Sequence, residues 1–183
     1  MSHGPIPPHG DWILCRPKLK GGRKYYGAYP AGFPERARIV LGATLNSPIL
    51  HACGGMARHY LYPRGFGPND KTLDMDPEVE PDFLQDARKP WPCFPRNTLW
   101  NCILIDPPYS TEDAKKYRPG ETAYPKPYEL LCRASEVLSV GGRVGILHYI
   151  WAKGPKTLRP IGVYPVLVGQ GNRIRVFTVF ERM

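Results

Sequence analysis

The sequence predicts an α/β fold: one doubly wound sheet, mostly parallel, that ends in an antiparallel hairpin. The apolar run 102–105 indicates a strand buried on both faces, which is typical of parallel sheets. A short first strand, 48–52, runs directly into two glycines and a predicted helix. Two β-rich runs, 162–168 and 173–182, are joined by Gly-Gln-Gly-Asn and indicate the closing hairpin.

Length and composition fit a single domain over residues 1–183. The chain is 42% hydrophobic and 11% aromatic, as expected for a globular protein with its own core. No apolar run approaches the length of a membrane span, and the N-terminus lacks the apolar segment of an export signal. The five cysteines are odd in number and no two have C-x-x-C spacing. We therefore expect reduced thiols, no metal site and a cytoplasmic protein.

The charge balance indicates a polyanionic partner. Lys and Arg number 25 against 16 Asp and Glu, which gives a net charge of +9. Such a charge favours nucleic acid, with a basic solvated surface as the alternative. Residues 1–24 are rich in Pro, Gly and basic side chains, and predict an irregular arm that either contacts phosphates or is simply solvated. With 22 Pro and 19 Gly in the chain, short helices and many loops are expected.

The elements before the central strand are short. The sequence predicts a helix over 35–41 or 35–45, a strand over 48–52, a helix over 56–62, a strand over 71–74 and a strand over 83–87. Few residues separate the last two strands, and three prolines argue against a helix in 88–99. Helices between the second and fourth strands of the sheet are therefore expected to be short or missing.

The segments after the central strand differ in character. The polar segment 110–127 is predicted to be a long loop on the substrate side, with Lys, Arg and Tyr side chains suited to phosphate contact and base stacking. A helix with one apolar face is predicted over 128–140, and Gly141-Gly142 is expected to end it. A strand over 143–150 follows, before the hairpin.

The central strand ends in Asp106-Pro107-Pro108-Tyr109. Two successive prolines cannot extend a sheet, because neither provides an N–H to the ladder. The resulting stiff turn presents a carboxylate, backbone carbonyls and an aromatic ring at the carboxyl end of the strand. In open α/β sheets this edge binds ligands. The alternative is an ordinary strand terminator with a surface Asp and Tyr.

Three further positions point to the same edge. Cys53-Gly54-Gly55 follows the first strand and gives a ligand access to bare backbone N–H groups. Asp74, about 20 residues beyond these glycines, has the place of a carboxylate that binds ribose hydroxyls. Asp86 lies at the end of the next predicted strand. The alternatives are a common glycine turn and two carboxylates that cap short helices. Cys53 is interpreted as a small packing residue, not a nucleophile.

In this order and spacing, these motifs resemble the class I S-adenosylmethionine-dependent methyltransferases, and more narrowly those that methylate amino groups of nucleic acid bases. Residues 106–109 match the DPPY signature after the fourth strand, and 29–34 (YPAGFP) resemble the segment before the glycine motif in several DNA methyltransferases. Residues 51–55 depart from the usual Asp, aromatic residue and G-x-G. The resemblance covers nearly the whole chain and implies a Rossmann-like methyltransferase fold with S-adenosyl-L-methionine as cofactor.

The resemblance also implies roles for individual residues. Asp106 and the carbonyl of Pro107 accept the two N–H bonds of an exocyclic amine, Pro108 stiffens the corner and Tyr109 stacks on the base. Asp74 holds the cofactor ribose and Asp86 its adenine amino group. The remaining cofactor-binding positions are Tyr29 and Phe33, which flank the methionine end, and Cys53, Gly54 and Gly55.

Several functions stay open on the sequence. The first is adenine-N6 methylation of DNA; the alternatives are an RNA base amino-methyltransferase and a non-catalytic nucleic-acid binder with a degenerate methyltransferase fold. A protein-glutamine methyltransferase is less favoured, because its tetrad begins with Asn. No segment has the length of a separate target-recognition domain, so specificity is expected from the arm, from 110–127, from a homodimer partner or from an accessory protein.

Overall fold

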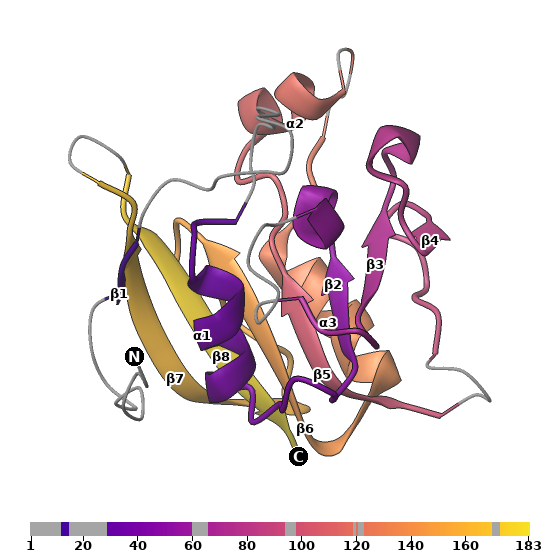
Figure 1. The fold of residues 1–183 in the computed structure, drawn as a ribbon, viewed down its shortest axis with the longest axis vertical. Helices are drawn as coiled ribbons and strands as arrows, with labels where there is room; N and C mark the ends of the chain where they lie inside the picture. Colours follow the sequence, from indigo (N-terminus) through magenta and orange to yellow (C-terminus); the bar gives the residue numbers. More distant parts are fainter. Residues whose placement is uncertain are drawn as a thin grey trace.

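The computed structural model describes residues 12–14, 29–59, 66–93, 98–118, 120, 123–169 and 173–183. Eight strands among these residues form one sheet in the order β1-β7-β8-β6-β5-β2-β3-β4 (Figure 1). Neighbouring strands are parallel except β6–β8 and β7–β8, which are antiparallel. The predicted doubly wound, mostly parallel sheet with a closing antiparallel hairpin is confirmed.

Among the described elements, strands and helices alternate from β1 to β4 and no longer do so after β4. The strands are β1 (Trp12–Ile13), β2 (Ile49–Ala52), β3 (Lys71–Asp74), β4 (Phe83–Leu84), β5 (Trp100–Ile105), β6 (Leu138–His148), β7 (Leu158–Leu167) and β8 (Arg175–Arg182). The helices are α1 (Phe33–Val40), α2 (Thr111–Tyr117) and α3 (Pro127–Val137), with the 3₁₀ helices η2 (Gly55–His59) and η3 (Pro77–Val79).

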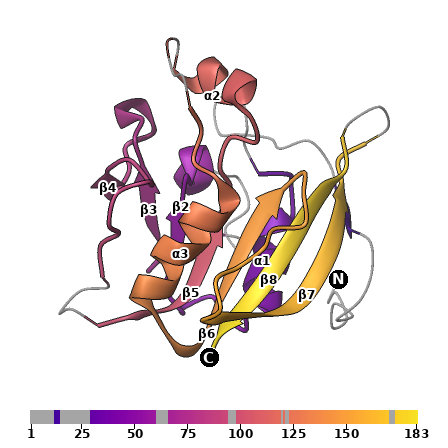
Figure 2. The same cartoon turned by 180° about the vertical axis from the view of Figure 1, so that it is seen from behind.

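Helices α1 and α3 cover opposite faces of the sheet (Figures 1 and 2). The two-residue period of the strands divides the central apolar residues between two cores. On β5, Cys102 and Leu104 belong to the core that includes α1, whereas Ile103 and Ile105 pack in the core that includes α3. The central strand is therefore apolar at successive positions, as the sequence indicated, because both of its faces are buried.

The part of the sheet formed by β2, β3 and β4 is thinly covered. Among the described residues, its connections contain only η2 and η3 as helical elements. Asp82 stabilises this edge instead, since it accepts hydrogen bonds from the Thr72 N–H (2.9 Å) and from Lys71 Nζ (3.1 Å). The expectation of short or missing helices between the second and fourth strands of the parallel sheet is confirmed.

The segment 110–127 is not the structureless loop that we expected, because residues 111–117 form α2. Ser110 caps this helix: its Oγ accepts a hydrogen bond from the Asp113 N–H at 3.1 Å. Acidic residues occupy the first turn and basic residues the last, in the order that the helix dipole favours. In Figure 1, α2 lies beyond the upper edge of the sheet, at the carboxyl ends of the parallel strands.

The predicted end of the next helix is also wrong. Helix α3 ends at Val137, and Leu138 already has extended backbone (φ −91°, ψ 138°). Gly141 and Gly142 lie inside β6, where the register slips between the pairs Trp100–Leu138 and Cys102–Arg143. A Cβ on Gly142 would lie 2.8 Å from the Ser139 carbonyl oxygen. The glycine pair therefore permits a bulge in a strand and does not cap a helix.

The remaining boundaries differ in smaller ways. Helix α1 begins at residue 33, two residues before its predicted start, and η2 ends its described part at His59. Residues 12–13 of the predicted arm form β1, which pairs parallel with β7. Residues 1–11 and 15–24 of the arm, residues 60–62 of the predicted helix 56–62 and residues 170–172 of the hairpin turn lie outside the described residues.

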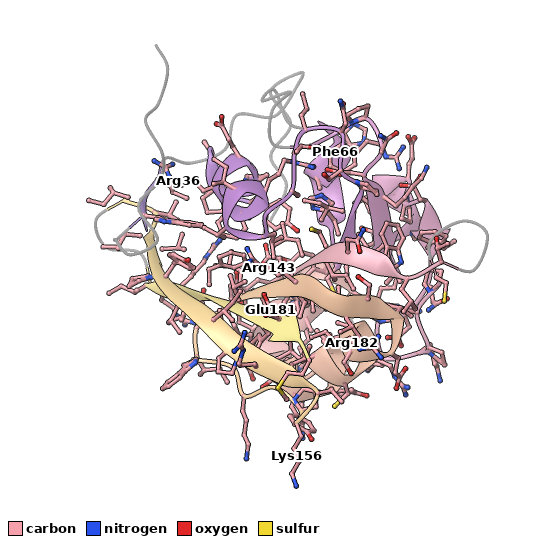
Figure 3. The ribbon with its side chains drawn as sticks, turned by 90° about the horizontal axis from the view of Figure 1, so that it is seen from below. Arg36, Phe66, Arg143, Lys156, Glu181 and Arg182 are labelled. Atoms are coloured by element: carbon pink, nitrogen blue, oxygen red, sulfur yellow. The ribbon has the colours of Figure 1, made fainter. Side chains whose placement is uncertain are left out.

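The end of the sheet opposite α2 is held by ionic contacts. Glu181 of β8 accepts a hydrogen bond from the Arg159 guanidinium (2.8 Å), and its other oxygen lies 3.5 Å from Arg143 Nε. Figure 3 views the molecule from this end and shows Arg143 and Glu181 above the strands, with Lys156 extending away from the body. These contacts join β6, β7 and β8, so charges at this end have a structural role.

Candidate functional site

The predicted motifs meet where the strand order reverses. Strand β2 pairs with β3 on one side and with β5 on the other, and the chain leaves β2 toward β3 but leaves β5 toward β6. Such a switch point is the usual ligand-binding crevice of an open α/β sheet. The Asp106 N–H donates to the Ala52 carbonyl oxygen at 3.2 Å, which places the proline corner directly beside the end of β2.

A cavity of about 290 Å³ opens at this switch point. Its volume is close to the lower bound of roughly 300 Å³ for small-molecule sites. Six predicted site residues line it: Cys53, Gly55, Asp74, Asp86, Asp106 and Pro108. The structure thus brings together residues from the ends of four strands, β2, β3, β4 and β5, that the sequence assigned to one site.

Asp106 is half-buried at the end of β5, where it lines the cavity. The Tyr109 hydroxyl donates a hydrogen bond to Asp106 Oδ1 at 2.7 Å. Burial raises the pKa of Asp106 to about 6, although the charge of Arg175 and the Tyr109 hydrogen bond act in the opposite direction. Asp106 is therefore ionised at neutral pH, and with Oδ1 bound to Tyr109 its Oδ2 remains as a hydrogen-bond acceptor.

The Tyr109 ring packs against two other rings and one arginine. Its ring centroid lies 4.3 Å from that of Tyr149 and 5.1 Å from that of His148, and Arg175 Cζ lies 5.5 Å from it. Burial and the Asp106 charge raise the pKa of Tyr109 well above its usual value, so the phenol stays a donor. The ring that we expected to stack on a base is therefore already packed within the protein.

Asp74 is fixed by backbone donors at the end of β3. Its Oδ2 accepts a hydrogen bond from the Gly55 N–H (2.9 Å) and its Oδ1 from the Asp76 N–H (3.0 Å). Burial raises the pKa of Asp74. Each carboxylate oxygen has a second lone pair, so Asp74 can still accept from ligand hydroxyls. Asp76 is the residue that caps η3, through a bond from the Glu78 N–H (2.9 Å).

Asp86 is engaged by an arginine that also lines the cavity. The Arg88 guanidinium donates to both Asp86 oxygens, at distances of 2.7 to 3.0 Å. This hydrogen bonding lowers the pKa of Asp86. A ligand amine that binds Asp86 therefore shares the carboxylate with Arg88, a residue that the sequence analysis did not single out.

The turn after β2 has an unusual backbone. Cys53 has φ +53°, a left-handed conformation that non-glycine residues adopt rarely and at a cost of roughly 1–3 kcal/mol. Burial, together with Asp74, Asp106 and Asp86, raises the pKa of its thiol well above the usual value. The thiol stays protonated, which agrees with the expectation that Cys53 is not a nucleophile.

Gly54 does not line the cavity. A Cβ at this position would lie 2.9 Å from the His51 carbonyl oxygen and 3.1 Å from His51 Cβ. Its N–H donates to the Leu73 carbonyl oxygen at 3.4 Å. Gly54 therefore allows the turn to fold back on β2, and Gly55 is the glycine that faces the cavity.

Tyr29, Phe33, Pro107 and Tyr109 also do not line the cavity. Tyr29 and Phe33 are 2% and 0% exposed and pack in the α1 core, where Phe33 contacts Phe177 edge-on at 5.1 Å between ring centroids. The geometry does not support their predicted contact with the methionine end of a cofactor. Pro107 is buried in the corner, whereas its neighbours Asp106 and Pro108 line the cavity.

Part of the cavity wall comes from residues outside the predicted cofactor motifs. Helix α2 and the segment that follows it contribute Ala114, Tyr117, Arg118, Ala123 and Pro125, while Met75, Pro77, Gln85 and Ala87 complete the side near β3 and β4. The pattern Ser110-x-x-Asp113 is a helix-start signal and was the available clue to α2.

The cavity is acidic although the protein is basic. Four aspartates line it against two arginines, in a chain with a net charge of +9. Within the described residues no cluster of three or more His, Cys, Asp or Glu side chains is arranged to hold a metal ion. No helix in the described part of the chain has the length and apolar character needed to cross a membrane.

Comparisons with known proteins identify the fold. No protein-family model matches the sequence, and no curated protein matches it either. Among solved structures, TrmN from Thermus thermophilus superposes with a TM-score of 0.60 at 18% identity, over 86% of this chain and 50% of TrmN. The chain thus spans about half the length of TrmN.

Two other solved structures match over most of their own length. An rRNA methylase from Streptococcus thermophilus gives a TM-score of 0.51 at 13% identity, over 85% of this chain and 97% of the methylase. A SAM-dependent methyltransferase from Aquifex aeolicus gives a TM-score of 0.51 at 14% identity, over 82% of this chain and 90% of that methyltransferase. At these identities the likeness concerns architecture, and it shows that the chain has the Rossmann-like fold of S-adenosylmethionine-dependent methyltransferases.

Proposed function

We propose that this protein is an S-adenosylmethionine-dependent methyltransferase that acts on the exocyclic amino group of a nucleic acid base. The observation that carries the proposal is the place of the Asp106 corner. It lies at the switch point of a methyltransferase fold and lines one cavity together with Asp74 and Asp86. The resemblance of residues 106–109 to the DPPY signature supports the same conclusion.

The charge of the cavity supports the choice of cofactor. S-adenosylmethionine carries a sulfonium and an ammonium group, and its ribose and adenine present hydrogen-bond donors. The three cavity aspartates other than Asp106, namely Asp74, Asp76 and Asp86, supply acceptors and negative charge for these groups. Asp74 would hold the ribose, and Asp86, shared with Arg88, the adenine amino group. When bound, the cofactor supplies an electrophilic methyl group.

The protein's own residues would orient a poor nucleophile, the exocyclic amine of the base. The lone pair of an exocyclic amine is delocalised into the base ring, so it attacks a methyl group slowly. Asp106 Oδ2 and the Pro107 carbonyl would accept its two N–H bonds and favour a pyramidal nitrogen. Because two prolines make the corner stiff, the protein would hold this orientation before the reaction begins. Such positioning contributes roughly 7–11 kcal/mol in the best intramolecular cases.

The base and the type of nucleic acid are the finer part of the proposal. The DPPY resemblance favours adenine N6 in DNA. Methylation of an RNA base is the second candidate, supported by the similar architecture of the Streptococcus thermophilus rRNA methylase over 97% of its length. A base in duplex DNA must also be flipped out, at a cost of about a few kcal/mol, which single-stranded RNA avoids.

A labelled-methyl assay tests the proposal. The protein is incubated with S-adenosylmethionine carrying a labelled methyl group and with single-stranded and duplex DNA, RNA and protein extracts, and the nucleosides are then separated. We expect label in a base-modified nucleoside. Label in protein, or none in any nucleic acid while calorimetry shows cofactor binding, would contradict the assignment. Label in N6-methyladenosine instead of its deoxy form would select RNA.

A further inference from the structure

Two arginines and two tyrosines form a stacked cluster beside the Asp106 corner. Arg173 Cζ lies 5.1 Å from the centroid of the Tyr149 ring, and Arg175 Cζ lies 5.5 Å from that of Tyr109. The two tyrosine rings contact each other, with 4.3 Å between centroids. We call these four residues the arginine–tyrosine cluster. None of the four lines the cofactor cavity.

The sheet register places this cluster at the ligand-binding edge. In the antiparallel pair β6–β8, His148 at the end of β6 lies opposite Val176 at the start of β8. Arg173 and Arg175 therefore flank the same edge at which β5 ends in Asp106. The charge of Arg175 lowers the pKa of Asp106, which agrees with their proximity.

The two cluster arginines differ from six of the nine other arginines that the structure describes. Arg38, Arg58, Arg88, Arg133, Arg143 and Arg159 each have a carboxylate within salt-bridge distance. Within the described residues, neither Arg173 nor Arg175 has one. Their guanidinium groups rest on aromatic faces, an arrangement that holds the cation in place without neutralising it. Arg173 is exposed and Arg175 half-buried.

We propose that the arginine–tyrosine cluster is a phosphate-binding site for the strand that carries the target base, with Arg173 as the phosphate contact and Arg175 as a positioning residue. Arg173 binds a phosphodiester next to the target nucleotide, and Arg175 holds Tyr109 and, through it, Asp106. This inference rests on the proposed function, since it names the substrate chemistry of that site. A flipped or unpaired base is the form that reaches a cavity, and a single-stranded oligonucleotide presents it without the cost of flipping.

Binding of a fluorescein-labelled single-stranded oligonucleotide, measured by anisotropy, tests the phosphate contact. RNA and DNA versions are titrated in the presence of S-adenosylhomocysteine. We expect Arg173→Gln to weaken binding about tenfold at low salt, as for the loss of one charged hydrogen bond. The slope of log K against log salt should become shallower by about 0.7, the value for one phosphate contact on a single strand.

The matched control is Lys156→Gln, which removes one positive charge at the opposite end of the sheet (Figure 3). We expect it to leave the affinity and the salt slope nearly unchanged. Equal losses for Arg173→Gln and Lys156→Gln would overturn the inference, because only net charge would then matter. So would wild-type affinity in Arg173→Gln. If such a variant still transferred methyl groups to nucleic acid, the proposed function would stand without this site.

A tryptophan provides a second readout that is local to the same edge. Trp151, two residues beyond Tyr149, is 68% exposed, whereas Trp12, Trp91 and Trp100 are 1–5% exposed. An unlabelled oligonucleotide should therefore quench the fluorescence of the wild-type protein, and Trp151→Phe should abolish the quenching. Quenching that persists in Trp151→Phe would place the bound strand elsewhere and overturn the inference. Cofactor affinity that is equal in all variants confirms that each one is folded.

Discussion

Replacement of Asp106 by Asn separates the charge of the proline corner from its shape. Asn has nearly the same size, and its Oδ1 can still accept the hydrogen bond from the Tyr109 hydroxyl (2.7 Å in the wild type). What it removes is a buried negative charge. Burial raises the pKa of Asp106 from 3.8 to about 6, so the folded protein binds this proton more tightly than the unfolded chain.

The expected effect on stability follows from this shift. One pKa unit corresponds to about 1.4 kcal/mol, so ionised Asp106 destabilises the fold by about 3 kcal/mol. The stability linked to the proton is fully present below pH 3.8 and is lost as the pH rises through about 6. Near pH 8, Asp106→Asn should therefore be more stable than the wild type by up to about 3 kcal/mol. This difference should shrink toward pH 4.

Three measurements test this variant: urea unfolding at several pH values for stability, calorimetry for cofactor affinity and a methyl-transfer assay for rate. We expect transfer to fall by about 10²–10³-fold, the range for loss of one preorganised electrostatic contact, with cofactor affinity nearly unchanged. Glu136→Gln, which removes an exposed carboxylate of α3, is the control and should show no such pH dependence. A stability difference that is the same at pH 5 and pH 8 would refute the buried titration. Parallel loss of transfer and cofactor binding would refute the assigned role.

Three other variants test separate parts of the site. Arg175→Gln removes a charge that lowers the pKa of Asp106. The pH at which the transfer rate falls on the acidic side of its pH profile should therefore move above 6, and an unchanged profile would contradict the coupling between Arg175 and Asp106. Asp74→Asn should weaken cofactor binding by calorimetry about tenfold with little change in kcat, as for loss of one charged hydrogen bond, and a pure kcat effect would argue against ribose binding. Gly54→Ala places a Cβ 2.9 Å from the His51 carbonyl oxygen, so unfolding should show a loss of about 1–3 kcal/mol. Unchanged stability would mean that the turn relaxes freely.

Local chemistry explains what the sequence predicted well. The apolar residues of β5 and the two prolines after it fix a buried strand and its end by short-range sterics, and Asp106 lies in the cavity as expected. Asp74 and Asp86 follow adjacent parallel strands, so their places along the chain were enough to bring them to one edge.

Long-range packing explains what it predicted badly. Tyr29 and Phe33 are aromatic residues near a ligand motif, and only the contacts of α1 with Trp12 and Phe177 assign them to the core. The proximity of Arg175 to Asp106 depends on the β6–β8 register, which no local pattern encodes. The end of α3 was missed for a similar reason, since pairing of Leu138 with Trp100 decides that β6 begins there.

A crystal structure with S-adenosylhomocysteine bound would test the central claim most directly, namely that the cavity at the switch point holds the cofactor with its sulfur toward the proline corner. We expect the ribose hydroxyls on Asp74, the adenine amino group near Asp86 and the sulfur facing Asp106 and Pro108. A ligand bound outside this cavity, or bound inside it with the sulfur turned away from Asp106, would contradict the account.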